Sequence, residues 1–143
     1  MNTHVFRLLP HEDLRSGIEH WCTEHDLLGA AMVTCVGSLR IASLRMAGGT
    51  EVVTREGPFE IVSLVGTWTR MGGHFHISLA DNQGVLWGGH LCRGSKVYTT
   101  AEIVLIDIGM HNPTRTLDIH TGYPELEVQH TTLPSTSDSS RSS

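Results

Sequence analysis

Three histidines lie close together in the sequence, His74 and His76 in the segment HFH and His90 in the segment GGHL. A neutral imidazole is a common ligand for transition metals. Three of them at about 2.0–2.1 Å from Zn²⁺, with a fourth position open, form a site that can hold water or a ligand. Imidazole also suits nickel, copper and iron, so the pattern predicts a divalent transition metal, with zinc as the first candidate. The alternative is a polar sheet face whose histidines bind nothing.

The segment DNQG between these histidines predicts the tight turn of a β-hairpin. Gly84 stands where a three-residue loop over 82–84 needs a left-handed residue, with a bulge of the G1 type. Asp81 would then pair with Val85. A two-residue loop would instead shift the register by one position and move every side chain of one strand to the other face.

The three-residue loop sets His76 directly opposite His90, and His74 opposite Cys92. Residues two apart share a face of a strand, and directly opposed Cβ atoms lie about 4.5–5.5 Å apart, so the three imidazoles can converge. The other face of the predicted hairpin is apolar and carries Phe75, Ile77, Leu79, Val85, Trp87 and Leu91. This separation of apolar from polar residues favours the three-residue loop.

The rest of the chain predicts the elements that position the hairpin. Apolar and β-branched segments indicate strands at 4–9, 30–46, 58–69, 95–108 and 114–119. Residues 11–29 predict a helix with an apolar stripe of Leu14, Ile18 and Trp21, which ends near Gly29. One or two helices, together with strands that are joined by short turns, indicate an α+β fold with a largely antiparallel sheet.

The predicted strand at 58–69 is apolar on both faces. Side chains alternate along a strand, so Phe59, Ile61, Ser63 and Val65 are expected to share one face. Apolar residues on the opposite face are typical of a central strand, or of a strand whose second face meets another subunit.

Length and charge limit the classes of function. The 143 residues suit one domain, expected over 1–130, followed by a Ser/Thr-rich tail over 131–143 that we expect to be disordered. The net charge of −5 gives no general attraction to nucleic-acid phosphates. Three separated cysteines, no apolar leader and no run long enough to span a membrane predict a reduced, cytoplasmic protein.

Three segments, EGPFEIVSLVGT, HFHISLADNQGVLWGGHL and KVYTTAEIVL, together resemble the plants and prokaryotes conserved (PPC) domain, which in plants is fused to AT-hook DNA-binding motifs. The resemblance runs from Val5 to Tyr123. It implies an α+β subunit that assembles as a homotrimer and holds a metal on His74, His76 and His90. Prokaryotic members that consist of this domain alone are commonly labelled as DNA-binding proteins. This sequence lacks the Arg-Gly-Arg-Pro core of an AT-hook, which would enter an A·T minor groove.

Two carboxylates lie inside these family-like segments, Glu60 and Glu102. Each is surrounded by apolar strand residues, so we expect partial burial and a partner. One role is to orient a histidine that binds the metal. The alternative is a salt bridge with Arg40, Arg45 or Lys96, or a contact between subunits.

Three functions follow from these observations. The first is a metal-containing oligomerisation module without enzymatic activity, which the resemblance and the lack of a known catalytic motif favour. The second is a small metalloenzyme that acts on a small ligand through an open three-histidine site. The third is DNA binding or regulation, which the family label suggests and the acidic net charge disfavours.

Overall fold

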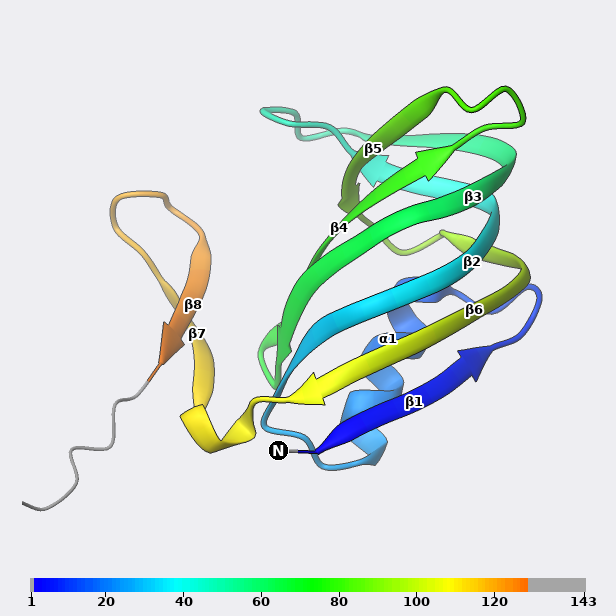
Figure 1. The fold of residues 1–143 in the computed structure, drawn as a ribbon. Helices are drawn as coiled ribbons and strands as arrows, with labels where there is room; N and C mark the ends of the chain where they lie inside the picture. The colour runs from blue at the N-terminus through cyan, green and yellow to red at the C-terminus, as the bar shows by residue number, and fades with distance from the viewer. Residues whose placement is uncertain (1, 129–143) are drawn as a thin grey trace, which may run out of the picture.

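One strongly curved antiparallel sheet and one α-helix make up most of this computed structural model, which describes residues 2–128 (Figure 1). The elements in chain order are β1 (Thr3–Leu8), α1 (Leu14–Glu24), β2 (Gly29–Arg45), β3 (Val52–Thr69), β4 (Gly72–Ala80), β5 (Leu86–Leu91), β6 (Lys96–Asp107), the 3₁₀ helix η1 (Gly109–His111), β7 (Pro113–Leu117) and β8 (Pro124–Val128). The main sheet has the strand order β1-β6-β2-β3-β4-β5, and β7 and β8 form a separate hairpin. The predicted α+β class with a largely antiparallel sheet is confirmed. The predicted tail over 131–143 lies outside the described residues.

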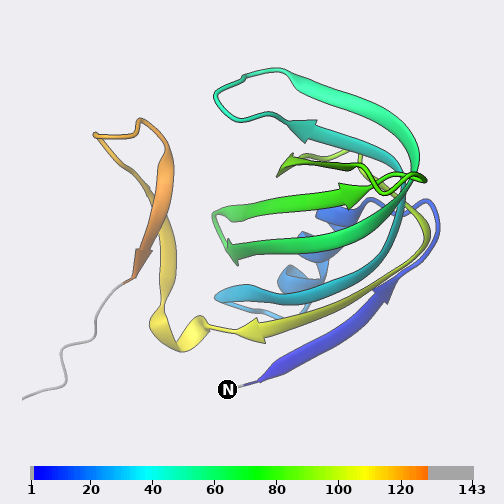
Figure 2. The same cartoon turned by 45° about the horizontal axis from the view of Figure 1, so that its top comes forward.

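The long strand β2 closes part of the sheet on itself. It pairs with β6 on one side, with β3 on the other and, at its end, with β5. In this last pairing Leu44 lies opposite Leu91, and Arg45 lies opposite His90. Strands β2, β3, β4 and β5 therefore form a closed circuit of pairings, and the sheet curls accordingly (Figure 2). His90 is consequently held between two neighbouring strands, β4 and β2.

Helix α1 packs on the sheet and is shorter than the predicted 11–29. Its buried residues are Leu14, Ile18 and Cys22. The Asp13 side chain caps the start of the helix, because it accepts a hydrogen bond from the backbone N–H of Ser16 at 3.0 Å. Gly29 begins β2 rather than ending the helix. Trp21, predicted in the buried stripe, is only partly buried. Within the described residues no helix is long and apolar enough to cross a membrane.

A β-bulge changes the faces of β3 halfway along the strand. The register with β4 shifts between Ile61 and Ser63. Phe59 and Ile61 are buried as predicted, but beyond the bulge Leu64 is buried and Val65 is exposed. The prediction that Ser63 and Val65 share the face of Phe59 and Ile61 is therefore wrong, because the extra residue of a bulge reverses the alternation.

Strand β3 also begins earlier than the predicted position 58. Its pairing with β2 continues on both sides of the Gly57-Pro58 peptide bond, which is cis. The pairing register shifts between Leu39 and Ile41 on β2, opposite this segment. Strand β3 thus runs through this segment with an irregular pairing to β2.

The β7-β8 hairpin stands beside the sheet (Figure 1). Its ladder runs from the pair Pro113–Val128 to the pair Leu117–Pro124. The sequence predicted one strand over 114–119 and did not predict β8. Four of the five β8 side chains are exposed, so this strand carries no alternation of buried and exposed residues that could have indicated it.

Candidate metal centre

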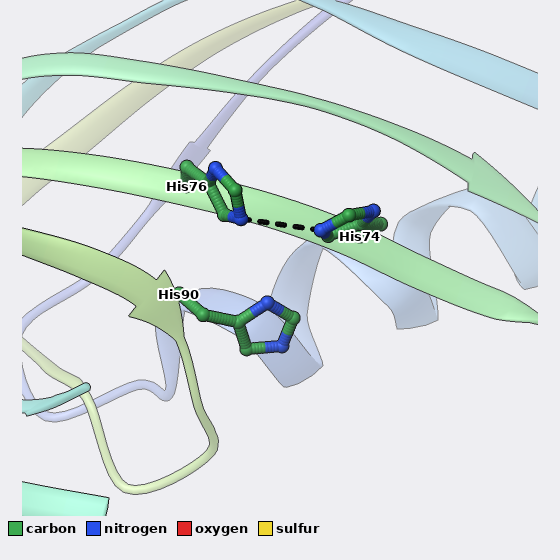
Figure 3. A group of neighbouring side chains, drawn as sticks. All are labelled: His74, His76 and His90. Atoms are coloured by element: carbon green, nitrogen blue, oxygen red, sulfur yellow. Dashed lines mark hydrogen bonds between the residues drawn. The ribbon is translucent and has the colours of Figure 1, made fainter. Parts of the chain in front are cut away.

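The ladder between β4 and β5 pairs His76 directly with His90, as the turn predicted. His74 lies two residues before His76, on the same face of β4. One ring nitrogen from each of the three lies within 4.8 Å of the other two. Figure 3 shows the three rings turned toward one another, and their centroids are 4.9 to 5.7 Å apart. We call these three residues the histidine cluster.

The predicted three-residue loop is confirmed in its hydrogen bonds. The backbone N–H of Asp81 donates to the carbonyl oxygen of Val85 at 3.0 Å, and that of Gly84 donates to the carbonyl oxygen of Asp81 at 3.0 Å. Gly84 has a φ of 81°, the left-handed value that the loop requires. The Asp81 carboxylate also accepts hydrogen bonds from the N–H groups of Gln83 and Val85, each at 2.9 Å. This turn fixes the register that brings the histidines together.

Two details of the predicted hairpin are wrong. The apolar face is buried at Phe75, Ile77, Leu79 and Leu91. Val85, predicted on that face, is 59% exposed because it lies at the turn. Cys92 does not lie opposite His74 in the ladder, because β5 ends at Leu91 and the Cys92 N–H donates to the carbonyl oxygen of Ser43 at 3.0 Å. Cys92 is accordingly outside the histidine cluster.

Strand β3 supports the histidine cluster from the other side of β4. Thr67 lies opposite His74, and Val65 lies opposite His76. Gly66 stands between them, and a Cβ at Gly66 would lie 2.2 Å from the carbonyl oxygen of His74. Glycine at this position lets the two backbones approach, so the cluster sits on a closely paired part of the sheet.

Arg15 of helix α1 reaches the cluster, and sequence reasoning missed it. Its Nη1 donates to the carbonyl oxygen of Leu91 at 2.8 Å and lies 3.3 Å from Nε2 of His90. Its Nη2 donates to the carbonyl oxygen of Gly73 at 2.9 Å. Nothing in the spacing of Arg15 relates it to residues so far along the chain. Only the packing of α1 against the ends of β4 and β5 brings it there.

The Nδ1 atom of His90, on the opposite side of the ring from the Nε2 that Arg15 approaches, could bind a cation. Nδ1 is buried and has no hydrogen-bond partner among residues 2–128. A guanidinium can only donate, so Nε2 accepts from Arg15, and in a neutral ring the proton lies on Nδ1. A metal at Nδ1 would replace that proton and leave one on Nε2, facing a donor. Metal binding through Nδ1 therefore requires Arg15 to release Nε2.

Burial and neighbouring arginines favour the neutral form of two histidines of the cluster, His74 and His90. Burial, followed by the positive charges of Arg45 and Arg15, lowers the pKa of His90 to about 4. Burial likewise lowers the pKa of His74, with smaller contributions from His76 and Arg115. Both imidazoles are thus uncharged at pH 7, which is the form that binds a metal.

A cleft opens directly beside two of the histidines, His74 and His90, and has a volume of about 530 Å³. Its walls come from the loop after β2, the turn before β4 and the β7-β8 hairpin. The charged residues that line it are Arg15, Arg45, Arg115 and Glu125. A metal held by the cluster would consequently be accessible to a small ligand from this side.

Neither predicted carboxylate lies at the cluster. Glu60 of β3 and Glu102 of β6 are exposed, against the expectation of partial burial. Neither lines the cleft beside His74 and His90. Neither forms a salt bridge among the described residues, including with Arg40, Arg45 or Lys96.

Known proteins resemble this chain over most of its length. A family model described as the Plants and Prokaryotes Conserved (PCC) domain matches residues 1–109. The bifunctional protein GlmU of Synechococcus sp. (strain JA-3-3Ab) is 40% identical over 129 residues, which cover 90% of this chain but 21% of GlmU. The chain thus spans about a fifth of the length of the curated relatives it matches.

Solved structures share the fold over nearly the whole chain. A hypothetical protein from Salmonella cholerae-suis has a TM-score of 0.87 and 33% identity, covering 90% of this chain and 93% of that one. A metal-containing protein from Archaeoglobus fulgidus has a TM-score of 0.69 and 27% identity, covering 87% and 92%. A protein from Bacteroides thetaiotaomicron, provisionally described as DNA-binding, has a TM-score of 0.80 at 19% identity, covering 89% and 92%, and shows the fold alone.

Proposed function

The chain belongs to the Plants and Prokaryotes Conserved domain family, and from that premise we propose that it is a trimer-forming protein that binds a divalent transition metal. His74, His76 and His90 would hold the ion, and zinc is the first candidate. When bound, zinc supplies a Lewis acid at the wall of the cleft. We place the protein in the cytoplasm, where its three unpaired cysteines would stay reduced.

The observation that carries the metal proposal is the convergence of three imidazole nitrogens within 4.8 Å. The unpartnered Nδ1 of His90 adds to it, because a buried polar atom without a hydrogen bond is unfavourable unless something else satisfies it. The lowered pKa values of His74 and His90 favour the neutral, ligating form. The name of the Archaeoglobus relative, a metal-containing protein, points the same way.

Metal analysis of the untagged protein, purified without chelator, tests this proposal. We expect about one ion for each chain. His76→Ala should lose it, because two imidazoles are a poor zinc site. His20→Ala is the matched control, since His20 is an exposed histidine of α1 and lies outside the cluster. Metal-free wild-type protein, or equal metal content in His76→Ala, would contradict the proposal.

The trimer proposal rests on an apolar sheet face that one chain leaves uncovered. Val5 of β1, Val36 of β2 and Val65 of β3 are 70%, 59% and 56% exposed. A patch of this kind is typical of a contact with another protein. Family resemblance supplies the occupant, two further copies of this chain. Light scattering during size-exclusion chromatography that gave the mass of a stable monomer would contradict it.

The exposed carboxylates suit this contact better than the metal. Glu102 lies between Arg7 of β1 and Val36 of β2 in the sheet, in the same exposed area. We therefore assign Glu102 to the contact between subunits. Glu60 lies between Ser38 and Ala80 and receives the same assignment. A carboxylate at a subunit contact needs a basic partner from another copy.

A small metalloenzyme is the second candidate, and the cleft beside His74 and His90 favours it. An open position on the ion would let a substrate reach it from that side. A crystal structure of the metal-loaded protein in which protein groups fill every position on the ion would end this candidate.

Binding to duplex DNA is the third candidate, and it rests on the labels of structural relatives. The net charge of −5 opposes it, because phosphate contacts supply most of non-specific DNA affinity. A gel-shift assay at low salt decides the matter. No complex at high protein concentration would remove the candidate.

A further inference from the structure

The cleft beside the histidine cluster is positively charged, although the chain as a whole is acidic. Among residues 2–128, its lining includes three arginines, Arg15, Arg45 and Arg115, and one acidic residue, Glu125. The whole chain has a net charge of −5. A local excess of positive charge inside a concave site attracts and concentrates anions.

Arg45 belongs to the histidine face of the sheet. It lies directly opposite His90 in the β2-β5 pairing, so the two side chains share a face. Its Nη1 donates to the carbonyl oxygen of Gly49 at 3.2 Å, which holds the guanidinium against the loop that forms one wall of the cleft. It has no salt bridge among residues 2–128. The rest of its guanidinium fork, including Nε and Nη2, makes no hydrogen bond to other described residues.

Arg115 lies on β7 and also lines the cleft. Its Nη2 donates to the Thr67 hydroxyl at 3.0 Å, and its Nε donates to the carbonyl oxygen of Gly72 at 3.3 Å. Thr67 is the residue paired with His74. These contacts hold the guanidinium beside the cluster through neutral acceptors only. Its Nη1 has no acceptor among the described residues, so a half-buried positive charge keeps a donor toward the cleft.

Arg15 differs from the other two because its donors are used. Its Nε forms a salt bridge with Glu19 at 3.1 Å, and its two Nη atoms donate to the carbonyl oxygens of Leu91 and Gly73. Its charge is therefore offset by a carboxylate, and it acts as a strut between α1 and the strands. Among the described residues of the lining, Arg45 and Arg115 keep free donors and form no salt bridge, although the nearby Glu125 carboxylate partly offsets the charge of Arg115 and raises its pKa against the lowering by burial.

We propose that Arg45 and Arg115 bind the oxyanion group of a small molecule, a carboxylate or a phosphate, in this cleft. A guanidinium presents two parallel N–H groups, which match the two oxygens of such a group. The site deepens the proposed function, since the anion would lie beside the metal on the histidine cluster. The arginines nevertheless contact the anion themselves, so its binding can be measured with and without metal.

Isothermal titration calorimetry tests this, with inorganic phosphate in one arm and acetate in the other. Both the metal-free and the zinc-loaded protein are titrated. The anion that binds with the lower dissociation constant identifies the kind of oxyanion. Arg45→Gln and Arg115→Gln should each weaken binding by about tenfold or more, because each removes charge-assisted hydrogen bonds. Arg40→Gln is the matched control, since Arg40 is exposed and lies over the ring of Tyr98 instead.

Arg115→Lys is a second variant that separates loss of anion binding from loss of folding. It keeps the charge but loses the two-pronged donor, so we expect the same protein melting temperature as wild type and weaker anion binding. The proposal is overturned if neither anion binds either form, or if the double variant Arg45→Gln/Arg115→Gln binds as tightly as wild type. Arginine-dependent binding to a protein that takes up no metal would support this site and reject the metal proposal. A protein that binds zinc at the histidine cluster but binds neither anion would support the metal proposal and reject the anion site.

Discussion

His76 and His90 are directly paired across β4 and β5, with ring centroids 5.7 Å apart. This pairing places the candidate metal site on a hydrogen-bonded ladder rather than on loops. A third ligand, His74, needs no further element, because it is two residues away on the same strand. The short turn over 82–84 thus sets the relative positions of the three histidines, and changes to the turn should alter the affinity for the proposed metal.

The first prediction concerns that turn. Gly84→Val should lower the free energy of unfolding by about 1–2 kcal/mol, because a β-branched residue is strained at positive φ. Gly84→Asn should be tolerated better, since asparagine adopts the left-handed conformation more readily. Urea unfolding of the metal-free proteins measures both. Equal destabilisation by valine and asparagine would show that the left-handed conformation is not what Gly84 provides.

The second prediction concerns the pH dependence of the metal-free protein. The pKa of His90 is about 4 in the folded chain, below the 6.5 of free histidine. The unfolded state therefore binds more protons between these values, so the contribution of His90 to stability is complete above pH 6.5 and is lost as the pH falls toward 4. His90→Asn should remove this loss.

Chemical denaturation at several pH values compares the two proteins. The unfolding free energy of wild type minus that of His90→Asn should become steadily less positive from pH 7 to pH 4. Carboxylates titrate in both proteins, so their contribution cancels in the difference. Parallel pH profiles would contradict the lowered pKa.

The third prediction concerns Arg15, which donates toward Nε2 of His90 from 3.3 Å. A metal-bound histidine normally donates its other N–H to an acceptor. Arg15→Gln replaces a donor-only group with one that can accept, and it also removes a positive charge near the ion. Zinc affinity, measured by competition with a chromophoric chelator, should rise by about tenfold. An unchanged or weaker affinity would show that Arg15 does not oppose metal binding.

The fourth prediction concerns assembly. Val36→Asp should dissociate the trimer, because the new carboxylate would lose its hydration in the proposed contact and would lie directly opposite Glu102, a like charge. Val85→Asp is the matched control, since both valines are 59% exposed in a single chain but Val85 lies at the hairpin turn. Light scattering gives the mass of each variant. The same mass for both variants would place the contact elsewhere.

The sequence allowed the histidine cluster to be predicted because its signal is local. A loop closed by Gly84 sets the register, and the register then decides which side chains meet. The bulge between Ile61 and Ser63 could not be predicted, because apolar residues stand on both sides of that strand and no change of pattern marks it. The arginines at the cluster could not be predicted because they are far from the histidines in sequence. Arg15 and Arg115 reach the cluster only through the packing of α1 and β7.

The most direct test of the metal site is an anomalous-scattering map from a crystal of the protein grown without chelator. Data collected on both sides of the absorption edge identify the element. We predict one anomalous peak for each chain, within bonding distance of a ring nitrogen of His74, His76 and His90. A map with no peak at these three histidines, from protein that had been supplied with zinc, would contradict the central claim.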